Sequence, residues 1–596
     1  MIEHDRQQVS AEDAAAVKPV AVEAAAVEAA ARVLGVPLAP TMAERIAEGA
    51  QAAVTAVAAA SRQWDSVGPT APIGEPADYL GLLESLAPSA NALPVVGVTP
   101  DPVAQNSDEE LDIKENDPAA PWLDLDLVAA QALLGARGGG CEALVEAALQ
   151  RAAAMQAQTR AWLAMDAESA RERARWLEAL LQQGPRSHRL PLPLLGIPLA
   201  HKDMFNLPDG SPEAAVRSPS CGSKLHSRLQ SGGIATVIQR LEQAGAVTIG
   251  TLNMAEFALG ATGHNAARGD CANAHDSDYI AGGSSSGSGV AVARAAVFAS
   301  LGSDTGGSVR IPASVNGIFG LKPTYGLIPR TGSMKLAPSV DVIGPLARSA
   351  RDIARLLRVV AGADGHDPLC SQRAVPDYEA AVQEGVAGLQ VGIPDRYFFE
   401  GVEPQVRRAL DHLRTGLEAA GVRFKVIEIP DVSALAELSR AVVYAEATGL
   451  HAPMLRASAD DYSAQVRLRA STGLGIAAPV YWAALRLRLP ILEQFVRQVF
   501  GQCEALFTPT IPIRVPRRDA TDVGAGQALW PILSQLVRCT APFNYLGVPA
   551  ITVPAGWDES GLPVGAQFVA RPFAEPVLLR LAAASQACGG MKRPRK

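Results

Sequence analysis

The amino-acid sequence predicts an α/β protein: one large domain with a largely covered sheet, preceded by an α-helical N-terminal extension. Residues 10–64 are rich in Ala, Val and Glu and have helical periodicity. Residues 66–122 have no sustained period and contain nine prolines. From about residue 123 onward, amphipathic helical segments alternate with short β-branched runs, which is typical of helices that cover a sheet. The chain of 596 residues is long enough to bury a large core.

The first 65 residues are predicted to form a helical hairpin. Their periodicity is broken once, at residues 35–40. Thr41 followed by Glu44 matches a capping box, so the second helix is expected to begin at Thr41. Two roles are open for the hairpin, a contact in a homodimer or a brace within the chain. The following segment, 66–122, contains the acidic run 108–112 and is predicted to be a long extended linker.

Residues 123–590 are predicted to form the α/β domain, and residues 591–596 a solvated basic tail. The expected elements of the domain are a helix over 125–155 interrupted near 138–140, a buried strand over 194–199, a helix over 234–244 that ends at Gly245, and strands over 246–249, 550–554 and 564–569.

Composition and charge argue against several classes of function. The net charge of −8 gives no electrostatic footprint for nucleic acid or for an anionic membrane surface. No apolar window reaches the ~18–20 residues of a spanning helix, and the acidic start lacks the hydrophobic stretch of a secretory signal. The seven cysteines are scattered and form no C-x-x-C pair. They predict reduced thiols, a cytoplasmic location and no zinc site.

Two glycine- and serine-rich segments are candidates for chemistry. The run 282–289 lies between the strand-like residues 279–280 and a helix that begins near Val290. Glycines let its backbone turn tightly and present N–H groups to an anion, although such a run is also typical of a flexible linker. In the run 302–312, Ser308 follows two glycines. That pattern fits a nucleophile on a sharp turn beside an oxyanion hole, and it equally fits a serine that caps a helix.

A lysine completes the candidate site. Lys202 follows the apolar run 194–199, and burial at such a position lowers the pKa of a lysine. The structural alternative is a lysine that extends from a strand end into solvent. The three segments occur in one order within one predicted domain.

Taken together, these segments resemble the motifs of the amidase signature family. The resemblance covers residues 123–590. The matching stretches are Gly196-Ile-Pro-Leu-Ala-His-Lys202-Asp203, Gly282-Gly-Ser284-Ser-Ser-Gly-Ser288, Gly302-Ser-Asp-Thr-Gly-Gly-Ser308-Val-Arg310, Gly317-Ile-Phe-Gly-Leu-Lys322-Pro323-Thr324, Asn253-Met-Ala-Glu256-Phe, Gly344-Pro345-Leu-Ala-Arg348, Gly547-Val-Pro549-Ala-Ile-Thr-Val-Pro554 and Gly561-Leu-Pro563-Val-Gly-Ala-Gln567.

The resemblance implies a mixed β-sheet covered by helices on both faces and a Ser–cis-Ser–Lys triad of Ser308, Ser284 and Lys202. Neutral Lys202 would take a proton from Ser284, which would take one from Ser308, and Ser308 would attack the amide carbonyl. The implied enzyme is an amidase, a hydrolase acting on C–N bonds of linear amides other than peptide bonds. It would convert a small-molecule carboxylic amide to an acid and ammonia or an amine, with no metal and no organic cofactor.

The resemblance also implies supporting residues around the nucleophile. The backbone N–H groups of Thr305, Gly306, Gly307 and Ser308 would stabilise the oxyanion. Ser285 and Ser286 would be supporting hydroxyls or bystanders.

Asp304 and Arg310 flank the nucleophile and have two interpretations. Arg310 could clamp a substrate carboxylate, or it could pair with Asp304 and make the oxyanion loop rigid. We favour the ion pair, because a loop with so many turns needs support.

Three other functions compete with this interpretation. In a Ser-His-Asp hydrolase, the G-x-S-x-G match at residues 283–287 would make Ser285 the nucleophile. The chain could also be the amidase component of a tRNA-dependent amidotransferase-like complex, although residues 370–480 contain no Arg-Tyr-Asp-Gly-Val-Arg-Tyr-Gly stretch. A binding protein without catalysis is the third. The identity of the amide substrate is open, because no motif anchors the acyl pocket.

Overall fold

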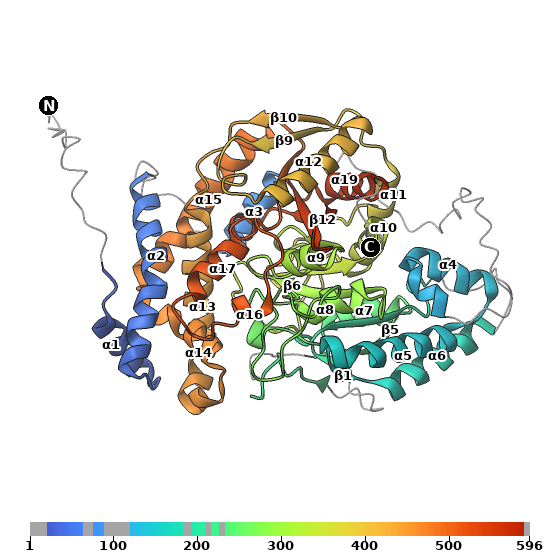
Figure 1. The fold of residues 1–596 in the computed structure, drawn as a ribbon, viewed down its shortest axis with the longest axis horizontal. Coiled ribbons are helices and arrows are strands. Elements are labelled where there is room, and N and C mark those ends of the chain that lie inside the picture. The colour runs from blue at the N-terminus through green and yellow to red at the C-terminus, as the bar shows by residue number, and fades with distance from the viewer. Residues whose placement is uncertain are drawn as a thin grey trace.

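The computed structural model describes residues 21–63, 76–88, 120–182, 192–208, 216–225 and 233–588. The predicted basic tail, 591–596, lies outside the described residues. Figure 1 shows the N-terminal helices on one side of the molecule, next to helices from the second half of the chain.

An eight-stranded mixed sheet forms the centre of the α/β domain. Its strand order is β10-β9-β11-β13-β12-β7-β8-β6, with β10/β9 and β9/β11 parallel and the other pairs antiparallel. β12 and β13 are apolar and buried along most of their length, as expected for strands with both faces covered. The strands are β6 Ala299–Asp304, β7 Phe319–Lys322, β8 Val342–Ala347, β9 Gln390–Pro394, β10 Arg423–Ile427, β11 Ala505–Pro509, β12 Ala550–Trp557 and β13 Pro563–Ala570.

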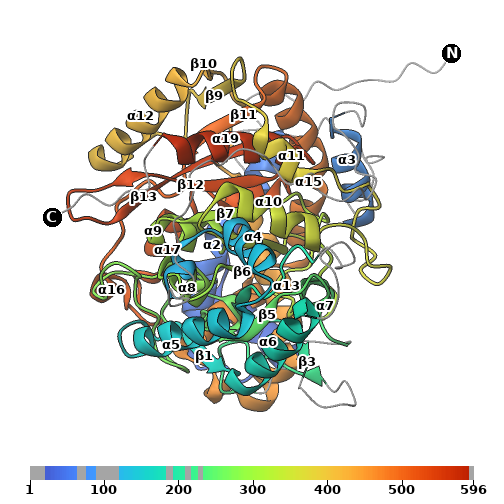
Figure 2. The same cartoon turned by 90° about the vertical axis from the view of Figure 1, so that its right-hand side faces the viewer.

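A three-stranded sheet of order β1-β5-β2 lies beside strand β6. It comprises β1 Trp162–Met165, β2 Pro198–Lys202 and β5 Val247–Leu252. Figures 1 and 2 place it at the opposite end of the molecule from β9 and β10. β3 Leu207–Pro208 and β4 Val216–Arg217 form a short ribbon.

Helices pack on both faces of the large sheet, as predicted. Helices α10, α12 and α19 form one group, α8 and α9 form the other, and members of both groups contact β7 or β12. The helices around the two sheets are α4 Leu127–Arg137, α5 Cys141–Thr159, α6 Ala167–Gln182, α7 Thr236–Gln243, α8 Ser286–Ala293, α9 Arg310–Asn316, α10 Ala350–Val360, α11 Tyr378–Gln383, α12 Pro404–Ala419 and α19 Glu575–Ala587. The predicted interruption near residues 138–140 is confirmed, because α4 ends and α5 begins there.

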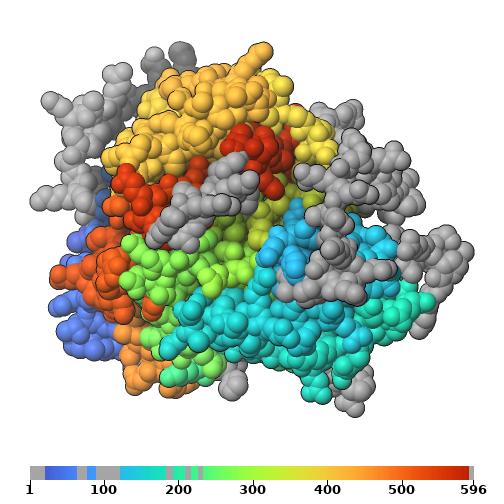
Figure 3. All heavy atoms as spheres, turned by 45° about the vertical axis from the view of Figure 1, so that its right-hand side comes forward, coloured from blue at the N-terminus to red at the C-terminus, as the bar shows by residue number. Residues whose placement is uncertain are grey.

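A second helical layer packs against the N-terminal hairpin. The hairpin helices are α1 Ala24–Leu34 and α2 Pro40–Gln63, and α2 lies against α13, α14 and α15. Figure 3 shows the blue N-terminal helices beside the orange segments of this layer. The other helices in this part of the chain are α13 Leu435–Ser458, α14 Ala464–Ser471, α15 Ala478–Phe500, α16 Arg518–Thr521, α17 Leu529–Val537 and α18 Ala541–Tyr545, with short 3₁₀ turns η6 Ala459–Asp461 and η7 Thr472–Gly475. A further 3₁₀ turn, η5 Glu256–Ala258, follows strand β5.

The start of the second hairpin helix differs from the prediction. Helix α2 begins at Pro40, so Thr41 lies inside the helix and does not cap it. Proline is favoured at the first helical position because its φ angle suits the helix and the missing N–H would have no partner there.

The prediction of an extended linker over 66–122 is wrong at two places. Residues Pro76–Ser85 form helix α3, and Ala120–Asp124 form the 3₁₀ turn η3. Tyr79 of α3 is buried and donates to the carbonyl of Tyr545 at 3.2 Å. Tertiary packing thus stabilises a short helix whose own periodicity is weak.

The predicted strand over 194–199 begins four residues late. Residues 194–197 form a turn in which Gly196 has φ +69°, and β2 spans Pro198–Lys202. A Cβ on Gly196 would lie 2.5 Å from Cys141 Sγ. The turn therefore needs glycine, and it shifts the strand so that Lys202 is its last residue.

All seven cysteines are free thiols. Within the described ranges, no helix has the length and apolarity needed to cross a membrane.

Candidate functional site

Three segments far apart in sequence meet at one end of the small sheet. Lys202 ends β2, Ser284 precedes α8, and Ser308 lies in the loop between β6 and α9. The backbone N–H of Ser285 donates to the carbonyl of Ser308 at 3.2 Å, which joins the second and third segments. The peptide bond between Gly283 and Ser284 is cis, as the family resemblance implied.

Lys202 lies in direct contact with two serines. Its Nζ donates to Ser284 Oγ at 2.7 Å and to Ser303 Oγ at 2.8 Å. The side chain is 1% exposed. Burial lowers the pKa of Lys202 to about 7, although the negative charges of Asp341 and Asp304 act in the opposite direction. A lysine in this state can be neutral near pH 7 and accept a proton from a hydroxyl.

The loop that carries Ser308 is organised around a buried ion pair. Arg310 Nη2 lies 2.9 Å from Asp304 Oδ1, and both side chains are fully buried. The predicted Asp304–Arg310 pair is therefore present. Burial raises the pKa of Asp304, but the charge and hydrogen bonds of Arg310 outweigh it and hold the pKa below its usual value. Arg310 also donates to the carbonyl of Thr540 and to the side chains of Gln567 and Asn544.

Arg310 thus has a structural role. Its guanidinium contacts protein acceptors on several sides and is 0% exposed, which leaves no room for a substrate carboxylate. Asp304 in turn accepts from the backbone N–H groups of Gly307 at 2.7 Å and Val309 at 3.1 Å. The pair therefore sets the course of the loop from β6 into α9.

The predicted oxyanion donors divide into two groups. The N–H of Gly307 is taken by Asp304, so it does not point at a bound oxyanion, contrary to the prediction. The N–H groups of Thr305, Gly306 and Ser308 have no acceptor among the described residues. All three residues line the cavity described below, so their N–H groups are the available donors.

Gly307→Ala is expected to lower kcat/KM for an amide substrate by about 100-fold or more. Gly307 has φ +132°, and a Cβ there would lie 2.3 Å from Thr540 Oγ1. The loop must move, and the neighbouring donors move with it. Gly385→Ala is the control, because a Cβ at Gly385 meets no atom within 4 Å and Gly385 lies outside the loop that carries Ser308. We expect it to cost less than about tenfold in the same assay, and equal losses would contradict the steric argument.

A cavity opens at Ser308. Its wall includes the strained turn η5, where Phe257 and Ala258 have φ angles of 50° and 60°. Another part of the wall comes from α13, α14 and α17 and includes Arg440 and Arg469.

Ser285 does not have the surroundings of a nucleophile. Its side chain is fully buried, and its hydroxyl donates to the carbonyl of Ser303 at 3.4 Å. No histidine ring within the described segments is hydrogen-bonded to it; the buried ring of His201 instead accepts from the N–H of Leu301 at 3.1 Å. The nucleophile-elbow interpretation therefore has no general base at Ser285.

Several residues of the site were missed by the sequence analysis. Ser303 lies inside a quoted motif, and strand alternation could have found it, because neighbours in β6 point to opposite faces. Ser303 contacts Lys202, whereas Asp304 contacts Arg310. The cavity residues Arg440, Tyr444 and Arg469 carry no sequence signal, since they lie in helices whose partners only the fold reveals. Among the described residues, no three His, Cys, Asp or Glu side chains are placed to hold a metal ion.

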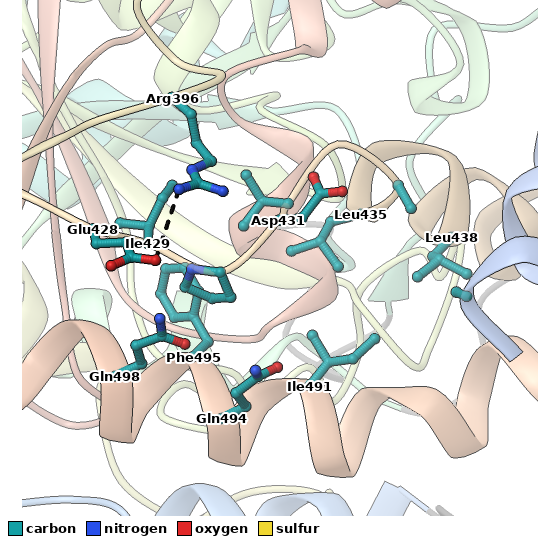
Figure 4. Close-up of a pocket in the computed structure, with 14 residues that line it drawn as sticks. Arg396, Glu428, Ile429, Asp431, Leu435, Leu438, Ile491, Gln494, Phe495 and Gln498 are labelled. Atoms are coloured by element: carbon teal, nitrogen blue, oxygen red, sulfur yellow. Dashed lines mark ion pairs between the residues drawn. The ribbon is translucent and has the colours of Figure 1, made fainter. Parts of the chain in front are cut away.

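A second cavity lies on the other side of helix α13. Figure 4 shows Leu435 and Leu438 of α13 facing Phe495 and Ile491 of α15, with Arg396 paired to Glu428 at the rim. It contains no serine and shares no lining residue with the cavity at Ser308. Helix α13 therefore separates the two cavities.

The chain is similar to known proteins in sequence and in fold. The Amidase family profile matches residues 143–579. A glutamyl-tRNA(Gln) amidotransferase subunit from Roseiflexus sp. (strain RS-1) is 36% identical over 466 residues, which cover 74% of this chain and 92% of the relative. A solved chain from a vestigial protein complex that reveals the origins of an s-triazine catabolic enzyme has a TM-score of 0.72 and 30% identity, covering 79% of this chain and 100% of its own. Native peptide amidase from Stenotrophomonas maltophilia has a TM-score of 0.66 and 27% identity, covering 80% and 99%.

Proposed function

Because the chain belongs to the amidase family of hydrolases, which cleave C–N bonds of amides, we propose that it hydrolyses a linear carboxylic amide through an acyl-enzyme on Ser308. The observation that carries the proposal is the 2.7 Å contact of the buried Lys202 Nζ with Ser284 Oγ, next to the cavity that Ser308 lines. The seven free cysteines suit a reducing compartment, and we propose the cytoplasm.

In the proposed reaction, protons move from Ser308 toward Lys202 as the amide is attacked and return toward the leaving nitrogen as the C–N bond breaks. Neutral Lys202 takes the proton of Ser284, Ser284 takes that of Ser308, and Ser308 Oγ bonds to the amide carbon. The N–H groups of Thr305, Gly306 and Ser308 stabilise the negative oxygen. Ser284 then protonates the leaving nitrogen as the C–N bond breaks, and water releases the acid from Ser308 by the same path.

The direct test is release of ammonia or amine from a panel of small amides. The panel contains aliphatic, aryl and ureido amides and a carbamate, and acyl-enzyme on Ser308 is followed by intact-mass spectrometry. Turnover of any member with a trapped acyl group on Ser308 supports the proposal. Absence of turnover together with no labelling by an active-site serine probe would refute it.

The rate is expected to rise with pH through the pKa of Lys202. This group must be neutral to act as a base, and its pKa is lowered to about 7. Below that pH it is protonated and inactive, so kcat/KM should fall about tenfold per pH unit, and above it the profile should level off. A kcat/KM profile measured at constant ionic strength checks this. A kcat/KM that does not change between about pH 5 and 8 would contradict the role of Lys202 as the base.

A second candidate is the amidase component of a tRNA-dependent amidotransferase-like complex. The name of the relative at 36% identity favours it. The net charge of −8 gives no support for contact with tRNA by this chain alone. Glutamine-dependent ammonia release that rises when partner proteins and glutamyl-tRNA are added would favour this candidate over a stand-alone amidase.

We further propose that the N-terminal hairpin braces the wall of the substrate cavity. Gly49 of α2 lies so close to Trp530 of α17 that a Cβ would be 2.4 Å from the ring. The Trp530 ring packs against Tyr444 at 5.7 Å between centroids, and the guanidinium of Arg440 lies 5.6 Å from it. Tyr444 and Arg440 both line the cavity, so displacement of α2 would shift the wall of the substrate cavity.

Gly49→Ala is expected to destabilise the protein by about 1–3 kcal/mol through overpacking against Trp530. Gly81→Ala in α3 is the matched control, because a Cβ there meets no atom within 4 Å. Both changes gain the same helix propensity, about 1 kcal/mol, so the difference isolates the contact. Urea unfolding measures the free energies, and a Gly49→Ala variant as stable as Gly81→Ala would rule out the close packing.

A further inference from the structure

The cavity at Ser308 has an unusual charge balance. Its charged lining residues are Arg440 and Arg469, and no carboxylate lines it within the described part of the chain. The rest of the wall is small or apolar apart from a few hydroxyl groups and backbone. A pocket with two fixed cations and no anion favours a ligand that brings negative charge.

Arg440 already has its partners in the protein. Its Nη1 lies 3.1 Å from Glu437 Oε2, and its Nη2 donates to Ser534 Oγ at 2.6 Å. Its guanidinium also lies over the ring of Trp530. Glu437 therefore offsets the charge of Arg440, and Arg440 offers the cavity no free donor pair.

Arg469 differs from Arg440, because one of its guanidinium donors has no partner among the described residues. Its Nε donates to the hydroxyl of Tyr444 at 3.2 Å, and that contact orients the guanidinium. Its Nη1 is buried and has no hydrogen-bond partner among the described residues. Arginine keeps its charge when buried, so an unpaired Nη1 costs free energy until an acceptor arrives.

We propose, on the basis of the proposed amidase function, that the substrate is an amide that carries a carboxylate but no ammonium group beside it, and that Arg469 binds this carboxylate. The planar guanidinium matches the two oxygens of a carboxylate. An ammonium group would need an acidic partner, and the described wall offers none. The class is therefore the monoamide of a dicarboxylic acid, in contrast to an amino-acid amide such as glutamine.

The test compares three amides with one carbon skeleton: glutaramate, its neutral analogue pentanamide, and glutamine, which adds an ammonium group to glutaramate. Binding is measured by calorimetry to the full-length Ser308→Ala protein, so that turnover does not interfere. We expect glutaramate to bind about 10- to 100-fold more tightly than pentanamide, the range for a hydrogen bond to a charged group. Glutamine is expected to bind more weakly than glutaramate.

Arg469→Met in the Ser308→Ala background should remove the preference for glutaramate and leave pentanamide within about threefold. Arg497→Met is the control, since Arg497 is 75% exposed and pairs with Glu493 at the surface. It should leave all three affinities unchanged. Equal binding of glutaramate and pentanamide to the Ser308→Ala protein overturns the inference even if Arg469→Met fails to fold.

Hydrolysis by the wild-type protein separates this inference from the proposed function. Turnover of neutral amides at rates equal to glutaramate would overturn the carboxylate site and leave the amidase function intact. Arg469-dependent binding of glutaramate without hydrolysis of any amide would support the site and refute the function. Tighter binding of glutamine than of glutaramate would overturn the exclusion of an ammonium group.

Discussion

Lys202→Ala is expected to lower kcat/KM for amide hydrolysis by about ten-thousand-fold, and Ser308→Ala by at least as much. Lys202 Nζ contacts both Ser284 and Ser303, and no other cation is hydrogen-bonded to Ser284 in the described part of the chain. Without the lysine the relay has no base. Without Ser308 no acyl-enzyme can form. Steady-state ammonia release with the best amide of the panel measures both losses.

Lys322→Met is the matched control for Lys202→Ala. Lys322 is also fully buried, and burial, with a contribution from nearby Arg310, lowers its pKa to about 7. Its Nζ donates to the carbonyl of Pro323 at 3.0 Å and to no serine. Removing it therefore tests the loss of a buried cation without the loss of a base, and we expect kcat/KM to stay within about tenfold of wild type.

Ser285→Ala tests the competing nucleophile in the same assay. Its small expected effect follows from its full burial and from the absence of a histidine partner among the described residues. If Lys202→Ala kept near-normal activity while Ser285→Ala lost it, the assignment of the triad would be wrong.

Arg310→Met is expected to destabilise the protein by about 3–5 kcal/mol, because it leaves the buried charge of Asp304 without its partner. The side chains of Arg310 and Asp304 are both 0% exposed. Asp304 also holds the N–H groups of Gly307 and Val309, so the loop that carries Ser308 should loosen. Urea unfolding measures the loss of stability, and amide turnover should fall with it.

The surface pair Arg408–Glu559 provides the control for Arg310→Met. It is closer, at 2.6 Å, but its side chains are 62% and 72% exposed. Arg408→Met should cost less than about 1 kcal/mol, as exposed pairs usually do. The double variant Asp304→Asn/Arg310→Met removes both charges and should recover part of the loss. A single Arg310→Met variant with wild-type stability would show that the pair does not hold the loop.

Local sequence was sufficient for much of the fold. The periodicity of 125–155 and the glycines near 140 predicted α4 and α5 with their interruption. The apolar runs near 550 and 564 predicted β12 and β13. Amphipathic period and glycine are local properties, and no distant partner is needed to read them.

Two of the errors arose where distant contacts overrode local preference. Helix α3 forms in a proline-rich segment because Tyr79 is buried and bonded to Tyr545. Strand β2 starts late because Gly196 must turn against Cys141. In both cases the deciding neighbour lies far away in the chain, so no local window contains it.

The sequence by itself determined the family, the α/β class and the identity of the candidate residues Lys202, Ser284 and Ser308, because short motifs carry backbone turns and reactive groups in a fixed order. Only the tertiary structure decided how deeply those residues are buried and which partners they bond to. Burial lowers the pKa of Lys202, and Asp304 accepts the N–H of Gly307. Arg469 lines the cavity of Ser308, and its Nη1 is unpaired among the described residues. Desolvation and hydrogen-bond partnership depend on which segments pack together in space, and that packing is a property of the whole chain.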